Sequence, residues 1–325
     1  MKNILVTGAG GFIGSHLTEL LVKKGYNVKA FIHYNSQNNW GWLEKSKIKN
    51  KIEIYQGDIR DYDSVIKSMK NIDTVFHLAA LIGIPYSYIS PLAYIRTNIE
   101  GTYNILEASK QMNIENILIT STSETYGSAQ YIPIDEKHPK VGQSPYAATK
   151  ISADEISLSF YRSFDMPVKI VRPFNTYGPR QSARAIIPTI ISQIIDGKKE
   201  LKLGNLTPTR DLTFVKDTVN GFYEISKSSK CIGRAVNIGM NSEISIGNLV
   251  KIICELTAKK NIKIISNLER IRPEKSEVTR LYCDNSLIKE ITNWNPKYNI
   301  QEGLKETIEW TQKNINLFKS DLYNV

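Results

Sequence analysis

A glycine-rich turn near the start of the chain constrains the fold more than any other sequence feature. Residues 3–7 form a short, mostly apolar run, Gly8-Ala-Gly-Gly11-Phe-Ile-Gly14 follows at once, and an amphipathic helical pattern begins inside the turn. A strand that turns through glycines directly into a helix is typical of a parallel α/β sheet. The unpaired amides at the start of such a helix favour a bound phosphate group.

Each glycine of this turn has its own stereochemical role. Gly8 permits the tight turn, Gly11 lets a pyrophosphate approach the backbone, and Gly14 lets the helix pack closely on the strand. The amides around Phe12 and Ile13 then face the phosphates. The spacing differs from the Gly-x-Gly-x-x-Gly of many dehydrogenases, and a purely structural turn is the alternative. The strand before it and the helix after it favour a dinucleotide site.

The first two thirds of the chain alternate short β-branched runs with longer amphipathic stretches. We expect strands at residues 3–7, 27–32, 52–56, 74–78, 116–121 and 167–172. We expect helices between them at residues 13–24, 62–70, 91–112 and 144–164. Repeated βαβ units predict an α/β fold with a doubly wound parallel sheet, the Rossmann arrangement, over residues 1–172. Residues 173–325 are richer in turns and predict a smaller C-terminal α/β lobe that closes over a ligand, with some segments returning to the sheet.

Composition argues against several other classes of protein. The 325 residues carry a net charge of +10 and are 41% hydrophobic, which excludes a disordered chain, collagen and a coiled coil. The lysines lack interleaved aromatic residues, so nucleic acid is not favoured as a partner. No apolar run approaches the roughly 18 residues of a membrane span. Because the start of the chain lacks the features of a signal peptide, we expect the protein to be cytoplasmic.

The three cysteines, Cys231, Cys254 and Cys283, are odd in number and widely spaced. This pattern predicts free, buried thiols, with neither a disulfide framework nor a metal site.

The end of the second predicted strand carries no carboxylate. Folds that bind the free 2′-hydroxyl of NAD usually have an acidic residue about 20 positions beyond the glycine turn. Here the polar side chains are His33, Asn35 and Ser36, which leaves both NAD and NADP open; for His33 the alternative is a solvated strand-end histidine. After the third strand, Asp58 can accept the adenine amino group beside the Ile59 amide, or else cap the next helix.

Tyr146 and Lys150 lie four residues apart in a helical pattern, so the phenol and the ammonium share one face. An unperturbed tyrosine has a pKa of about 10, and a neighbouring cation favours its phenolate. Such a pair also fits ordinary surface packing. Its position favours catalysis, because the hydroxyl-rich segment 121–127 ends the fifth predicted strand, at the edge where ligands of open α/β sheets bind.

With these motifs in order, the chain resembles the extended short-chain dehydrogenase/reductase family, which includes nucleotide-sugar epimerases and dehydratases. The resemblance covers essentially the whole chain. Its motifs are the glycine turn, Asp58-Ile59, His77-Leu-Ala-Ala80, Asn98, Ser121-Thr122, Tyr146 with Lys150, and Arg172-Pro-Phe-Asn175-Thr-Tyr-Gly-Pro-Arg180. It implies that Leu78, Ala79, Ala80 and Asn98 join the cofactor site. It also implies a homodimer formed through the helices predicted at residues 91–112 and 144–164.

The turn Ser-Thr122-Ser123-Glu124-Thr-Tyr-Gly resembles the form found in 4,6-dehydratases, whereas simple 4-epimerases resemble Ser-Ala-x-Val-Tyr-Gly. The resemblance implies that Thr122, Tyr146 and Lys150 serve C4 oxidation, and that Glu124 removes the C5 proton before water leaves from C6. Many dehydratases have an aspartic acid at the position of Ser123, but GDP-mannose 4,6-dehydratases have a serine there, as this chain does. Either Ser123 or Glu124 therefore protonates the leaving hydroxyl. The alternative for Glu124 is a solvated turn carboxylate.

The resemblance also implies a nucleotide-linked sugar as substrate. Arg210 and Arg272 lie in segments similar to pyrophosphate-binding motifs, Glu274 takes the place of a ribose contact, and Asn175 resembles a phosphate or sugar contact. Arg180, like Arg184, fits either a substrate contact or a surface ion pair.

Residues 31–42, with Trp40 and Trp42, are similar to the dehydratases that begin legionaminic acid synthesis from GDP-N-acetylglucosamine. That similarity favours NAD over NADP. It places the two tryptophans near the cofactor or at a subunit contact, with plain packing as the alternative.

Two other functions stay open on the sequence. One is an epimerase or decarboxylase on the same scaffold. The other is a dinucleotide-sensing protein without chemistry, which the set of Thr122, Tyr146 and Lys150 disfavours, because a sensor needs no proton relay.

Overall fold

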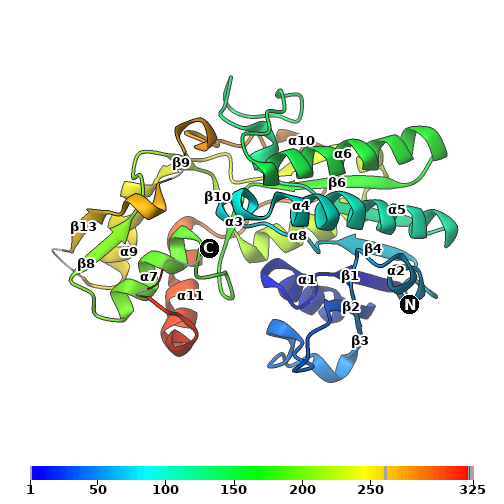
Figure 1. Cartoon of the computed structure of the whole chain (residues 1–325), viewed down its shortest axis with the longest axis horizontal. Helices are drawn as coiled ribbons and strands as arrows, with labels where there is room; N and C mark the ends of the chain where they lie inside the picture. Colours follow the sequence, from blue (N-terminus) through cyan, green and yellow to red (C-terminus); the bar gives the residue numbers. More distant parts are fainter. Residues whose placement is uncertain (1, 260–261, 272, 321, 323–325) are drawn as a thin grey trace.

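The computed structural model describes residues 2–259, 262–271, 273–320 and 322. Its centre is a seven-stranded, fully parallel sheet in the order β11-β6-β5-β4-β1-β2-β3 (Figure 1). The strands are β1 (Asn3–Thr7), β2 (Asn27–His33), β3 (Ile52–Gly57), β4 (Thr74–His77), β5 (Asn116–Thr120), β6 (Val168–Pro173) and β11 (Ala235–Ile238). The predicted doubly wound sheet is confirmed.

Helices cover both faces of this sheet, because side chains along each strand alternate between two apolar clusters. Ile4 and Val6 point into the cluster that includes residues of α1 and α8, whereas Leu5 points into the cluster that includes residues of α2, α5 and α6. The helices are α1 (Phe12–Lys23) and α8 (Val215–Lys227) on one face, and α2 (Tyr62–Ser68), α5 (Gly101–Gln111) and α6 (Pro145–Phe164) on the other.

The region predicted as one helix over residues 91–112 is built differently. α3 (Ile84–Ile89) is followed by α4 (Pro91–Tyr94), then by a wider π-helical turn, η3 (Ile95–Glu100), and then by α5. The wide turn contains the buried Asn98. Its side chain accepts a hydrogen bond from the Leu81 N–H and donates one to the Leu81 carbonyl, each at 2.9 Å. The regular helix is therefore interrupted where the Asn98 side chain forms hydrogen bonds with a neighbouring loop.

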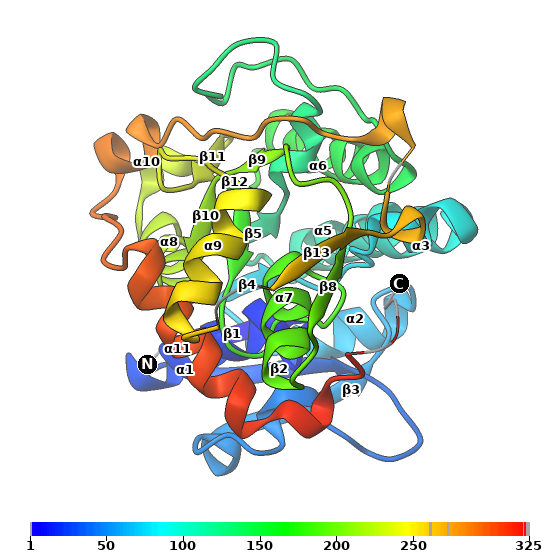
Figure 2. The same ribbon diagram turned by 90° about the vertical axis from the view of Figure 1, so that its left-hand side faces the viewer.

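The smaller lobe is made of three two-stranded pairs and the helices around them (Figure 2). The strands are β7 (Asn175–Tyr177) with β10 (Leu212–Phe214), β8 (Glu200–Leu203) with β13 (Lys263–Ser266), and β9 (Thr209–Arg210) with β12 (Ile244–Ser245). The helices are α7 (Ile186–Ile195), α9 (Ile246–Leu256), α10 (Ser286–Ile291) and α11 (Ile300–Lys313). From the same half of the chain, β11 joins the central sheet and α8 packs on α1.

One apolar cluster runs without a break from the sheet into the smaller lobe. It joins Val6 of β1 and Ala30 of β2 to Ile190 of α7, Leu249 of α9 and Leu304 of α11, all of them buried. The two lobes therefore share a hydrophobic core.

Two sequence expectations concern the chain as a whole. Over the described residues, no helix is both long enough and apolar enough to cross a bilayer. All three cysteines are free thiols; Cys231 and Cys283 are buried, but Cys254 is only partly so, since it lies on the outer side of α9.

Candidate active site

The glycine turn joins β1 to α1 with no room for side chains. Gly8 has a φ of +67°, and a Cβ there would lie 2.8 Å from the Ala79 nitrogen; a Cβ on Gly14 would lie 2.2 Å from the Gly8 carbonyl oxygen. No side chain caps α1, and the Phe12 and Ile13 amides donate no hydrogen bond to any described residue. These free donors fit a pyrophosphate group.

The segment after β4 lies beside this turn. The Thr7 hydroxyl accepts hydrogen bonds from the amides of Leu78 and Ala79, each at 3.1 Å, and it lies 2.8 Å from His77 Nδ1. Burial lowers the pKa of His77 to about 3, so its ring is neutral. Ala80 continues the same segment. β1 and β4 are the neighbours at which the strand order reverses, the place where doubly wound sheets bind ligands.

The polar residues expected at the adenosine end lie on the neighbouring strand ends. His33 and Ser36 are exposed, and the Asn35 side chain braces its own loop through two bonds to the backbone of Asn39. Asp58 follows β3, and a hydrogen bond from the Arg60 guanidinium lowers the pKa of its carboxyl.

Asp61, not Asp58, caps α2 by accepting a hydrogen bond from the Asp63 amide at 3.1 Å. The capping alternative for Asp58 is therefore wrong. Ile59, next to it, is buried and packs against Gly101.

The loop after β2 lies on the glycine turn. The Trp42 amide donates to the Gly10 carbonyl at 2.9 Å, and a Cβ on Gly10 would meet the Trp40 carbonyl. The Trp42 ring contacts Trp310 of α11 edge-on, with centroids 5.3 Å apart, as the red helix beside the blue loop illustrates (Figure 2). Both tryptophans thus lie next to the expected cofactor position.

The hydroxyl-rich turn after β5 forms a single helical turn, η4 (Ser123–Tyr126). Thr122 caps it by accepting a hydrogen bond from the Glu124 amide, and its side chain lies close enough to the Tyr146 phenol to favour the phenolate. Ser123 is buried. The Glu124 side chain is partly exposed and makes no hydrogen bond or ion pair with any described residue, so its carboxylate is free to meet a ligand.

Tyr146 and Lys150 share one face of α6, as predicted. Tyr146 is 7% exposed, and its ring contacts Tyr94 edge-on at 6.2 Å. Lys150 donates to the Thr120 carbonyl at 2.5 Å, and burial lowers the pKa of its ammonium to about 8.

The pKa of Tyr146 moves in the direction opposite to the one expected from a neighbouring cation. Burial raises the pKa, and the hydrogen bond with Thr122 and the Arg184 charge oppose this shift only in part. Lys150 does not offset the effect of burial, because its ammonium is turned toward a backbone carbonyl instead of the phenol. A further positive charge is needed to favour the phenolate.

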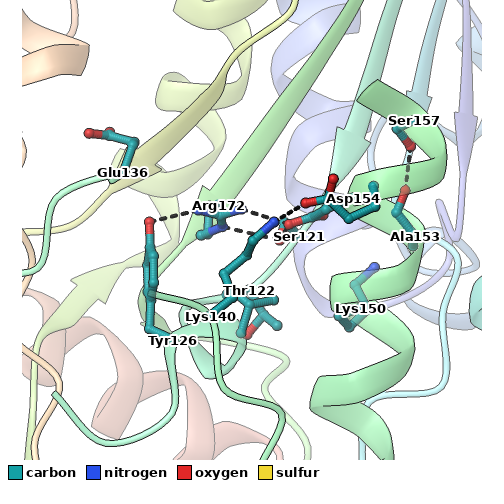
Figure 3. A network of polar contacts seen from close by, with 12 residues as sticks. Ser121, Thr122, Tyr126, Glu136, Lys140, Lys150, Ala153, Asp154, Ser157 and Arg172 are labelled. Carbon is teal, nitrogen blue, oxygen red and sulfur yellow. Dashed lines mark hydrogen bonds and ion pairs between the residues drawn. The ribbon is translucent and has the colours of Figure 1, made fainter. Parts of the chain in front are cut away.

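A buried charge network lies beneath the catalytic turn (Figure 3). Arg172 forms an ion pair with Asp154 at 2.7 Å and donates to the Tyr126 hydroxyl at 2.7 Å, while Ser121 donates to the same Asp154 oxygen. The carboxylate also raises the pKa of Lys150, one helical turn earlier. Asp154 was not among the residues predicted from the sequence, although its position four residues after Lys150 on the same helix could have indicated it.

Asp154→Asn is expected to lower the free energy of unfolding by about 3–5 kcal/mol, because it leaves the Arg172 guanidinium buried without its counter-charge. Urea unfolding measures this. The control is Glu155→Gln on the next residue, whose ion pair with Lys140 is largely exposed and contributes at most about 1 kcal/mol. Equal losses for the two variants would contradict the structural role given to the network.

The substrate residues expected in the smaller lobe are placed as follows. Asn175 begins β7, and its buried side-chain oxygen has no hydrogen-bond partner among the described residues. Arg210 is 8% exposed and bonds Glu277 at 3.2 Å. Glu274 is exposed at the start of the short helix η7 (Glu274–Ser276), and Arg272 lies outside the described residues.

The η7 segment is tied to the sheet domain. Tyr88 of α3 lies 2.5 Å from the Ser276 hydroxyl, and the Gln143 side chain donates to the Lys275 carbonyl at 3.0 Å. These bonds bring Glu274 and its neighbours to the same side of the molecule as the catalytic turn.

Two of the predicted ligand residues make protein contacts instead. Arg180 donates to Ser15 at 3.1 Å and forms an ion pair with Glu19 at 2.8 Å, both on α1, which favours the ion-pair interpretation. The Asn98 amide is fully used by Leu81 and Thr149, so it acts on the cofactor site through the loop that it positions.

A glycine turn at the switch point, with a tyrosine–lysine pair facing a Thr-Ser-Glu turn, defines an extended short-chain dehydrogenase/reductase. The chain belongs to the GDP-mannose 4,6-dehydratase family, whose model matches residues 5–307.

Similar proteins include both dehydratases and epimerases. The chain is 32% identical to a UDP-glucuronate 4-epimerase of Thermodesulfobacterium geofontis, over 98% of this chain and 99% of the relative. It is 30% identical to the human dTDP-D-glucose 4,6-dehydratase, over 98% and 92%. The crystal structure of dTDP-glucose 4,6-dehydratase from Bacillus anthracis in complex with NAD superposes with a TM-score of 0.87 at 27% identity, covering 98% and 99% of the two chains.

Proposed function

We propose that this protein is a nucleotide-sugar 4,6-dehydratase, which converts a nucleotide-linked hexose into its 4-keto-6-deoxy product. The observation that supports this best is the free carboxylate of Glu124, in the same turn as Thr122, whose side chain lies beside the Tyr146 phenol. A 4-epimerase needs no base beside C5, whereas water elimination does. The first substrate candidate is GDP-N-acetylglucosamine, because of the similarity of residues 31–42.

NAD is the proposed cofactor, since the similar Bacillus anthracis structure holds it. The glycine turn would bind its pyrophosphate, and Asp58 with Ile59 would meet the adenine. When bound, NAD takes up the hydride from C4 and returns it to C6, and its positively charged ring favours the Tyr146 phenolate.

The side chains then divide the reaction between them. Tyr146 accepts the proton of the C4 hydroxyl, with Thr122 beside the phenol, and a ketone forms at C4. The ketone makes the C5 proton acidic, and Glu124 removes it. The C6 hydroxyl leaves as water with a proton from Glu124 or Ser123, and C5 is reprotonated at the end. Cofactor is thereby regenerated in each turnover.

The test is incubation with GDP-N-acetylglucosamine and then with other nucleotide hexoses. A mass loss of one water, with deuterium from solvent at C5 of the product, is the expected result. Epimerisation at C4 leaves the mass unchanged and exchanges nothing at C5. Release of carbon dioxide from a nucleotide-linked uronic acid, without dehydration of any hexose, would favour the decarboxylase instead.

We also propose that two copies of the chain pair through α4, α5 and α6, which lie together along one side of the molecule (Figure 1). Large apolar side chains are exposed there although the rest of these helices is well packed. They are Leu92 (56% exposed), Ile95 (46%), Tyr103 (46%) and Phe164 (52%). Such side chains on neighbouring helices are typical of an interface.

Replacing both Leu92 and Ile95 by glutamate is expected to weaken this association at least about tenfold, because each buried aliphatic side chain contributes roughly 1.5–3 kcal/mol. Light scattering after gel filtration measures the mass. Leu268→Glu, at an 82% exposed position in the smaller lobe, is the matched control and should stay dimeric. A monomeric wild-type protein would contradict the proposal.

A further inference from the structure

Arg184 carries a charge that the protein does not pair. It lies between β7 and α7, and its side chain is partly buried. Its guanidinium makes no hydrogen bond or ion pair with any residue in the described part of the chain, whereas Arg172, Arg180 and Arg280 are all paired with carboxylates. A guanidinium has five donors, and leaving them unused away from bulk water is unfavourable, so an external acceptor is expected.

The position of this side chain is set by a glycine of the other lobe. Arg184 Nη1 lies 2.7 Å from where a Cβ on Gly83 would be, so the guanidinium tip packs directly on this glycine and a side chain there would displace it. The Gly83 carbonyl accepts a hydrogen bond from the Tyr94 hydroxyl, and the Tyr94 ring packs edge-on against Tyr146. Arg184 therefore reaches from the smaller lobe to the layer of side chains around the catalytic phenol.

The groups that face Tyr146 come from several elements. Thr122 and Glu124 come from the catalytic turn, Tyr94 from α4, and Arg184 from the segment before α7. On α6 itself, Lys150 is turned to the Thr120 carbonyl. The Arg184 charge lowers the pKa of both Tyr94 and Tyr146, which agrees with its position at the reacting end of the site.

We propose that Arg184 is a catalytic residue that binds the C4 oxygen of the 4-ketosugar and stabilises the enolate formed when C5 loses its proton. This inference rests on the proposed function. Glu124 takes the proton, and the electrons of the C5–H bond form a C4–C5 double bond as the C4 carbonyl becomes an enolate oxygen. The enolate then re-forms the carbonyl and expels the C6 hydroxyl, which leaves as water.

The enolate benefits from a cation because the negative charge that Glu124 loses on taking the proton appears on the C4 oxygen. A fixed guanidinium aimed at the oxygen where charge develops gives a large stabilisation of this charge. Arg210, which is expected at the diphosphate, lies on β9. Arg184 is thus assigned to the sugar and not to the nucleotide.

The experiment uses the isolated 4-keto-6-deoxy product, whose C5 hydrogen exchanges through the same enolate without hydride transfer. Arg184→Gln is expected to slow deuterium exchange at C5 about 10²–10³-fold. Arg184→Lys, which keeps the charge but loses the forked donors, should recover part of the rate. Affinity for GDP, or for the nucleoside diphosphate of the active substrate, should stay unchanged in calorimetry.

Two further variants separate this role from a structural one. Gly83→Ala keeps the arginine but displaces its tip, and at a φ of −73° the backbone tolerates alanine, so this variant should slow the exchange as well. Arg234→Gln, at an exposed position before β11, is the charge-matched control and should exchange normally.

Weaker GDP binding with normal exchange in Arg184→Gln would overturn the inference in favour of a diphosphate contact. Normal values throughout would make Arg184 a surface residue and overturn it too. If the wild-type enzyme dehydrates no nucleotide hexose, the proposed function itself fails. The inference about Arg184 is tested separately, by comparing the exchange rate of each variant with that of an active wild type.

Discussion

Tyr146→Phe is expected to lower kcat by about 10²–10⁴-fold, the usual contribution of a general base. The substitution removes only the phenolic oxygen, which lies beside Thr122, and keeps the ring that packs against Tyr94. Turnover of the nucleotide sugar, followed by mass spectrometry, measures the loss.

The affinity for NAD is the control for this variant, because the glycine turn that would bind the pyrophosphate lies on α1 and not on α6. Calorimetry should give the same affinity as for the wild type. Turnover that survives the change would remove Tyr146 as the base.

Glu124→Gln is expected to stop the reaction after C4 oxidation. Glutamine keeps the size of the side chain but cannot take the C5 proton, so elimination should slow by about 10²–10⁴-fold. Because C4 oxidation does not need this carboxyl, the ketohexose and reduced cofactor should accumulate in a single turnover. The absorbance of the reduced nicotinamide measures this directly.

The matched control is Asp135→Asn, which changes a partly exposed carboxylate on the loop after the catalytic turn that accepts a hydrogen bond from Tyr131. It should turn over at the wild-type rate. If Glu124→Gln produced the 6-deoxy sugar at normal speed, the carboxylate would have no part in the elimination, and the dehydratase proposal would lose its main support.

Local sequence patterns were sufficient to predict six of the seven strands of the sheet, with β11 as the exception, and the shared helix face of Tyr146 and Lys150. β1 with its glycine turn is defined by adjacent residues, and Tyr146 and Lys150 are placed together by a single helical turn. The strand ranges agree with the structure to within two residues, because buried parallel strands are continuous apolar runs.

The contacts that local patterns could not predict join distant parts of the chain. Arg180 reaches Ser15, 165 residues away, and Arg172 reaches Tyr126, 46 residues away. Neither partner is marked by periodicity, since a side chain's partner across the fold depends on how elements pack. The same holds for the tip of Arg184 at Gly83. Pairing between elements decided which arginines are free for a ligand.

The core shared by the two lobes limits how a scaffold like this can acquire a new substrate. Val6 of the sheet and Leu304 of α11 belong to one apolar cluster, so grafting the whole second half from a relative would mismatch side chains throughout the interior. Divergence between sugars is then easiest through single replacements around the candidate active site. Engineers who wish to retarget this enzyme should change individual residues around the candidate active site and leave the core that joins the two lobes unchanged.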